Sequence, residues 1–145
     1  MSESTKNYQE YNNLVNQKKS KQKQYNACED RIEEYDYLLK RLKAAKETVS
    51  AQKSSFSKIK KDDKNTVKEK YKWKGSNYNK FKSKGSSMMD ENDTYYNKSI
   101  DYVLDSLNNE ITRIENLKMD EYGLLGKLGS AINSLANKIE NFFNW

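Results

Sequence analysis

Proline and histidine are absent from the 145-residue sequence, cysteine occurs once, and only 34% of the residues are hydrophobic. Without proline, no residue forbids long uninterrupted helices. Without histidine, the chain lacks the imidazole that many nucleophile–base pairs and metal sites use. The lone Cys28 cannot form an intramolecular disulfide or a cysteine-rich zinc site. We therefore expect no enzyme activity, no cofactor and no metal, and we expect helix packing to supply the stability.

The sequence also has no run of the roughly 18 to 20 apolar residues that a membrane-spanning helix needs. Its first residues, MSESTKNYQE, are polar and do not resemble a secretory signal peptide. We expect the protein to be made and folded in the cytoplasm without stable membrane insertion, so that any export would depend on another route.

What the chain does contain is a long helical pattern in its first half, where apolar residues recur at alternating steps of three and four. The pattern predicts one amphipathic helix with an irregular step after Leu42, a stammer that would shift the packing seam. The positions are Tyr25, Cys28, Ile32, Tyr35, Leu39, Leu42, Ala45, Val49, Phe56 and Ile59.

The second half predicts another long helix with near-helical apolar spacing. Three glycines, Gly123, Gly126 and Gly129, then fall within seven residues, and each costs about 1 kcal/mol relative to alanine inside a helix. We expect a break within 119–129, followed by a kinked amphipathic segment. The apolar positions are Tyr78, Phe81, Met88, Tyr95, Val103, Leu107, Ile111, Ile114 and Leu117, widened by Tyr96 and Ile100 and continued by Leu128, Ile132, Leu135, Ile139 and Phe142.

Between the two patterns lies a highly charged segment that ends near Gly75. Glycine suits the left-handed conformation just past a helix end, and Ser76 can cap the next helix. The predicted fold is an all-α, elongated antiparallel helical hairpin forming one domain over 1–145. Its first arm covers about 5–70, its turn 71–76 near Trp73 and Gly75, and its second arm 77–143.

We call the two sets of apolar positions the stripes. Two helices packed on each other can cover only part of stripes this wide. The doublets Leu38/Leu39, Tyr95/Tyr96 and Leu124/Leu125 indicate a further helical surface, from a second copy or another protein. We predict a partner interface formed by the stripe positions Ile32, Tyr35, Leu38, Leu39, Leu42, Val49, Phe56, Val103, Leu107, Ile111, Ile114, Leu125, Leu128, Ile132, Leu135 and Ile139.

The tripeptide Trp73-Lys74-Gly75 lies near the middle of this proline-free pattern. Together with the two arms of similar length, Tyr78 and Phe81 after the tripeptide, and the aromatic tail ending in Phe142, Phe143 and Trp145, it resembles the WXG superfamily of type VII secretion in Gram-positive bacteria. The YwqH-like subgroup, whose genes accompany LXG-domain toxins, is the most similar.

The resemblance implies a targeting chaperone that binds the helical LXG region of a toxin and presents it to the secretion machinery, with Trp73 and Gly75 as the secretion motif. It also implies a cytoplasmic protein that can be exported together with the toxin. No aromatic-x-x-x-acid export signal follows Gly75. Four positions after the aromatic residues Tyr78, Phe81, Tyr95, Tyr96, Tyr102 and Tyr122 come Lys82, Gly85, Ser99, Ile100, Ser106 and Gly126, none of which is acidic. We therefore expect a second small helical partner to supply that signal.

Three alternatives are open. The chain could be a homodimeric structural protein. It could bind nucleic acid, since residues 1–75 carry 19 basic and 11 acidic side chains against 8 and 10 in 76–145, although few of the cations are arginines and no groove-reading module is present. The tail from Leu124 could lie on a membrane surface, but it carries only Lys127, Lys138 and Glu140 as charges. We expect neither nucleic acid nor membrane as the partner.

Overall fold

The computed structural model describes residues 3–70 and 76–143, with the side chains of 3–62 and 79–143. Over these ranges the fold is all-α and consists of two helices, α1 over Glu3–Lys70 and α2 over Ser76–Glu140. The prediction of an all-α helical hairpin is confirmed. Trp73 and Gly75, where the turn is predicted, lie outside the described residues.

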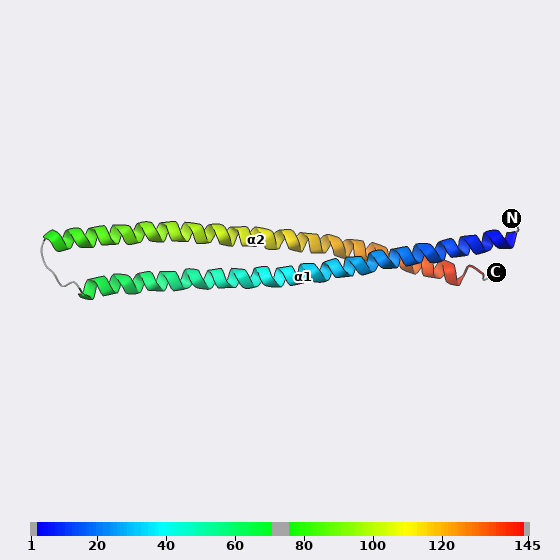
Figure 1. Ribbon diagram of the computed structural model, residues 1–145, viewed down its shortest axis with the longest axis horizontal. Coiled ribbons are helices and arrows are strands. Elements are labelled where there is room, and N and C mark those ends of the chain that lie inside the picture. The colour runs from blue at the N-terminus through cyan, green and yellow to red at the C-terminus, as the bar shows by residue number, and fades with distance from the viewer. Residues whose placement is uncertain (1–2, 71–75, 144–145) are drawn as a thin grey trace. The chain divides into compact units, whose positions relative to one another are not determined.

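Contacts divide the chain into two units, and each contains a segment of both helices. Unit 1 comprises Met1–Leu39 and Arg113–Trp145, and unit 2 comprises Lys40–Thr112. In each unit the segment of α1 lies beside the segment of α2 and runs in the opposite direction (Figure 1). That the chain forms one domain stays a prediction.

Side-chain pairs fix the antiparallel register within each unit. In unit 1, Tyr8 contacts Phe143 and Lys118 pairs with Asp36, so paired residue numbers add up to 151 and 154. In unit 2, Phe56 stacks on Tyr96 and Lys53 pairs with Asp101, which gives 152 and 154. Within each unit, nearly equal totals are what two antiparallel helices packed side by side produce. We call the line of residues between the helices the seam.

The seam of α1 keeps steps of three and four without interruption, so the expected stammer after Leu42 is wrong. The seam continues through Lys46, Lys53 and Lys60, whereas Ala45 is exposed. A lysine can hold such a position because its aliphatic stem covers apolar surface while its ammonium reaches water or an acid. The buried or half-buried seam positions of α1 are Tyr11, Leu14, Lys18, Lys21, Tyr25, Cys28, Ile32, Tyr35, Leu39, Leu42, Lys46, Val49, Lys53, Phe56 and Lys60.

The seam of α2 also differs from the predicted stripe at its start. Tyr95 and Met88, which the sequence assigns to the stripe, are 76% and 63% exposed, whereas the supposed flanking residue Ile100 is buried. The buried or half-buried seam positions of α2 are Asp93, Asn97, Ile100, Leu104, Leu107, Ile111, Ile114, Lys118, Glu121, Leu125, Leu128, Ile132, Leu135, Ile139 and Phe142.

Helix α2 runs through 119–129 without the expected break. The three glycines there weaken the helix, but Leu125 and Leu128 between them belong to a packed cluster with Tyr25, Cys28 and Ile32 of α1. Tertiary packing of an amphipathic face commonly outweighs local propensity in this way. A Cβ added at Gly129 would meet only the ring of Tyr25, at 3.7 Å.

Buried apolar residues are concentrated in unit 1. It contains Cys28, Ile32, Leu39, Ile114, Leu128 and Leu135, whereas unit 2 contains Ile100 and Ile111. Because burial of apolar surface is the main stabilising term, we expect the seam of unit 1 to be the more stable of the two. None of the described helical segments is long and apolar enough to cross a membrane.

Candidate protein-binding surfaces

The centre of unit 1 combines an apolar cluster with one polar contact between the helices. The Cys28 thiol lies 3.0 Å from Glu121 Oε2 and 3.1 Å from the Glu121 carbonyl oxygen, and the Arg31 Nε donates to Glu121 Oε1 at 2.8 Å. Burial raises the pKa of the Cys28 thiol, and its hydrogen bond to the carboxylate raises it further. The bonds from Arg31 and then Cys28 lower the pKa of Glu121. Cys28 is therefore a packed, protonated thiol that helps to set the helix register.

The seam of unit 2 is more polar. Phe56 and Tyr96 stack with their ring centroids 3.8 Å apart. The ammonium of Lys53 lies 2.6 Å from Asp101, and that of Lys60 lies 2.8 Å from Asp93, which raises the pKa of Lys60. Such partly exposed ion pairs contribute about 0 to 1 kcal/mol each. The seam of unit 2 is thus held mainly by a few apolar contacts and by screened charges.

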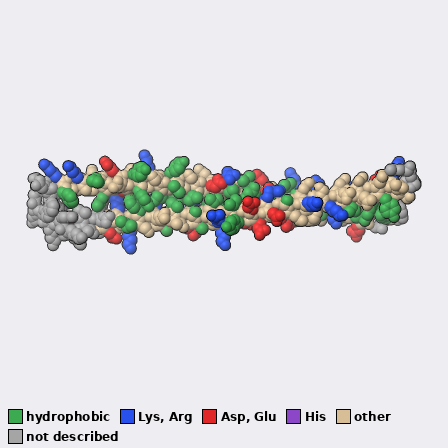
Figure 2. Space-filling view, viewed as in Figure 1, with side chains coloured by type: hydrophobic (Ala, Val, Ile, Leu, Met, Phe, Trp, Pro, Cys, Tyr) green, Lys and Arg blue, Asp and Glu red, His purple; other side chains and the backbone are tan. Residues whose placement is uncertain are grey.

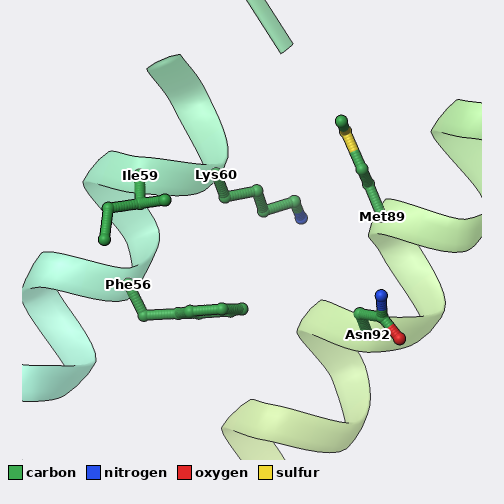
Figure 3. A pocket seen from close by; sticks show the side chains of 5 residues that line it. All are labelled: Phe56, Ile59, Lys60, Met89 and Asn92. Atoms are coloured by element: carbon green, nitrogen blue, oxygen red, sulfur yellow. The ribbon is translucent and has the colours of Figure 1, made fainter. Parts of the chain in front are cut away.

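A shallow pocket opens at one side of this polar seam. Phe56, Ile59 and Lys60 of α1 and Met89 and Asn92 of α2 line it. In Figure 3, the side chains of Phe56 and Lys60 extend toward α2, whereas Ile59 does not. The pocket is open and has few polar groups, and the described residues contain no cluster of side chains that could hold a metal ion.

Most of the predicted partner-interface residues lie in or beside the intramolecular seam. Six of them are buried, namely Ile32, Leu39, Ile111, Ile114, Leu128 and Leu135. Val103 is exposed. The half-buried ones are Tyr35, Leu38, Leu42, Val49, Phe56, Leu107, Leu125, Ile132 and Ile139. Their contact with a partner stays a prediction, and the buried ones already pack within the hairpin.

In the leucine doublets Leu38/Leu39 and Leu124/Leu125, one residue packs in the seam and its neighbour lies at the edge of the seam. Leu39 is buried in the seam and Leu38 beside it is only half-buried, while Leu125 packs on the Cys28 cluster and Leu124 is 40% exposed. Leu38, Leu117 and Leu124 directly precede the seam residues Leu39, Lys118 and Leu125. In two antiparallel helices, positions that directly precede a seam residue lie on the same side of the seam, so these three residues follow one edge of it in unit 1. We call these three residues the unit 1 rim.

A second apolar surface lies on α2 in unit 2. Phe81, Met88, Tyr95 and Tyr102 follow one another at intervals of seven residues, and all four are exposed. Tyr95 is two residues from both seam positions Asp93 and Asn97, or about 200° around the helix axis, so it points away from α1. Figure 2 shows hydrophobic side chains at the surface of unit 2 as well as between its helices. We call these four residues the outward row.

The spacing of the outward row is already present in the sequence. The interval of seven is visible in the sequence, as is the same interval between the seam residues Lys46, Lys53 and Lys60. Grouping residues by hydrophobicity alone placed Phe81, Met88 and Tyr95 in the stripe and left the lysines out of it. The acids that pair with Lys53 and Lys60 on α2 identify the true seam.

Among the comparisons with known proteins, only the one with protein-family models gives a match. There is no match among curated proteins or solved structures. A model of the YwqH-like family matches residues 9–137, which include the described seam of unit 2 and nearly all of that of unit 1. Because this match spans most of the chain, the protein belongs to the YwqH-like family.

Proposed function

We propose that this protein is a targeting chaperone that binds the helical LXG region of a type VII secretion toxin and helps to present it for export. The observation that carries the proposal is the unit 1 rim. After the two helices have packed, Leu38, Leu117 and Leu124 still have apolar surface beside the seam. Membership of the YwqH-like family supports the proposal, because the resemblance noted in the sequence implies a partner protein of LXG toxins for members of that family.

A helix is the partner that fits this surface. The rim residues of α2 are seven positions apart, close to two helical turns, and Leu38 of α1 faces the same edge. A third helix laid along that edge would place one apolar residue per heptad against them, as helices in bundles do. No catalytic step belongs to this function, which depends on apolar contact alone.

The experiment is co-purification of the chain with the helical N-terminal region of an LXG toxin from the same host, expressed together and washed at high salt. The test variant is Leu38→Gln with Leu124→Gln, since glutamine keeps helix propensity but removes apolar contact. The matched control is Met119→Gln, because Met119 is an exposed apolar residue of the same helix that lies outside the rim.

We expect the rim variant to lose most of the toxin region and the control to retain it, with unchanged helical circular dichroism in both. Retention by the rim variant would reject this surface. Recovery of the chain with no toxin region, even from wild type, would reject the chaperone function. Release of nucleic acid on raising the salt would favour the basic first half instead, because phosphate binding weakens steeply with salt.

Export is the second half of the proposed function. It assigns the secretion motif to Trp73 and Gly75, which lie outside the described residues, and a missing acidic export signal to a second small helical partner. A secreted fraction that contains the toxin together with this chain would support joint export.

A further inference from the structure

The edge of the unit 1 seam opposite to the rim forms a shallow groove that the proposed function does not use. Rim residues directly precede seam residues, whereas Val15, Lys19 and Gln22 of α1 directly follow seam residues and so lie on the other edge. An open pocket on this edge is lined by Val15, Lys18, Lys19 and Gln22 of α1 and by Ile139 of α2. We call this edge of unit 1 the groove.

Small residues of α2 form the other side of the groove. Gly126, Gly129 and Ala136 each directly follow a seam residue, so they lie on the same edge as Lys19. A Cβ added at Gly126 would meet no atom within 4 Å, so the space above this residue is open. Such small residues allow the backbone of another helix to come close to α2.

The net charge of the chain is concentrated around the groove. Residues 12–28 and 123–139 contain six lysines and no acidic residue, whereas the rest of the chain has 21 basic and 21 acidic side chains. Within the described parts of both helices, none of the six forms an ion pair, because the residues across from them on the other helix are uncharged. The six are Lys18, Lys19, Lys21, Lys23, Lys127 and Lys138.

An acidic segment follows directly on α1. Residues 29–36 carry five acids and one arginine, and Glu29 and Glu33 among them lie on the groove because each directly follows a seam residue. Like charges four residues apart, such as Lys19 and Lys23 or Glu29 and Glu33, cost free energy in an isolated helix. The hairpin does not compensate for this segregation with ion pairs to either glutamate in its described part. The pattern therefore favours a complementary surface on another molecule.

We propose that the groove binds an amphipathic helix of another protein whose charges are segregated in the complementary order. Its acidic residues lie beside Lys18 and Lys19, and its basic residues lie beside Glu29 and Glu33. Lys19 and Glu33 are fourteen residues apart, or about 21 Å along α1, so a helix of about four turns reaches from one to the other. The order of the charges also sets the direction in which that helix runs.

A protein helix fits this groove better than a nucleic acid or a membrane does. Val15 and Ile139 supply apolar surface beside the lysines, and an amphipathic helix can cover it with an apolar side chain. A phosphate chain or an anionic membrane that followed the groove beyond the lysines would meet Glu29 and Glu33. Placing like charges side by side costs binding free energy.

Fluorescence anisotropy of the full chain with two labelled synthetic peptides tests the groove. Both peptides have about 28 residues, enough for roughly 40 Å of helix, with the same composition and the same apolar positions. One carries glutamates in its first half and lysines in its second half, whereas the two charges alternate in the other. We expect the wild type to bind the segregated peptide at least about fivefold more tightly, with a smaller difference at high salt.

Two substitutions on α2 test the shape of the groove. Gly126→Gln fills it, and Gly123→Gln is the matched control, because Gly123 lies two residues from the seam residues Glu121 and Leu125 and so points away from α1. A Cβ at either glycine meets no atom within 4 Å, and glutamine is a better helix former than glycine, so both variants should fold. Gly126→Gln should weaken binding of the segregated peptide at least about fivefold, and the control should bind like the wild type.

A second matched pair tests the charges. Lys19→Glu should weaken binding of the segregated peptide severalfold. Lys23→Glu changes the net charge equally but lies two residues from the seam residues Lys21 and Tyr25, on the outer face of α1, and should have little effect.

Four outcomes would overturn the proposal. They are equal affinity for both peptides, equal loss of binding in the two members of either matched pair, tighter binding to single-stranded DNA or to vesicles of anionic phospholipid than to the segregated peptide, and self-association of the wild type that Gly126→Gln abolishes. The last result would assign the groove to a second copy of the chain. Toxin binding through the unit 1 rim is a separate measurement.

Discussion

Leu128 offers the sharpest test of the packing, because it lies at the centre of unit 1 and has a matched neighbour. Its side chain is 5% exposed and packs with Cys28 and Ile32, whereas Leu124, one turn earlier on the same helix, is 40% exposed. Leu128→Ala removes three buried carbons and leaves a cavity. Replacements of this kind in well-packed cores cost about 2 to 5 kcal/mol.

We expect the lower part of that range, about 2 to 3 kcal/mol, because a seam between only two helices can partly collapse into the space. Leu124→Ala should cost clearly less, about 1 kcal/mol, since a side chain that is 40% exposed gains only part of its transfer free energy on folding. Both changes have the same effect on helix propensity, so their difference reports on burial.

Urea unfolding followed by circular dichroism at 222 nm measures both free energies of unfolding. The two variants should have the same slope and clearly different midpoints. Equal destabilisation by both variants would refute the reasoning, because it would mean that Leu128 is no more buried than Leu124. A gain of stability in Leu128→Ala would refute it as well.

Three further predictions concern other parts of the molecule. Amide hydrogen exchange should be slower in unit 1 than in unit 2, because six of the eight buried hydrophobic residues lie in unit 1; equal protection would contradict this. Arg31 and Cys28 lower the pKa of Glu121 in the folded chain, so its stabilising effect is complete above its unfolded pKa and is lost as the pH falls through the folded one. Glu121→Gln should therefore reduce the free energy of unfolding at neutral pH. It should also make that free energy fall less steeply as the pH is lowered, as measured by a pH series of urea midpoints. An unchanged pH dependence would show that other carboxylates cause the decrease at low pH. Trp73→Ala should leave toxin co-purification intact but reduce secretion, as measured by immunoblots of cells and medium, and full secretion would remove Trp73 from the export motif.

The sequence alone determined that the chain forms long helices. The absence of proline and the steps of three and four between apolar residues predicted arms that start and end within three residues of α1 and α2. Ile32, Leu39, Leu128 and Leu135, which the spacing put on the apolar stripes, are buried between the two helices. These features follow from local backbone chemistry and helical periodicity, which a single sequence displays directly.

Only the tertiary structure decided which residues form the seam of unit 2. Lys53 and Lys60 lie in the seam because Asp101 and Asp93 stand across from them, whereas Tyr95 and Met88 lie outside it although they are more hydrophobic. In unit 1, the packing of Leu125 and Leu128 on the Cys28 cluster of α1 kept α2 helical through Gly123 and Gly126. The register between two helices depends on all contacts made at once, and a pattern along one helix contains no information about the side chains that the other helix presents.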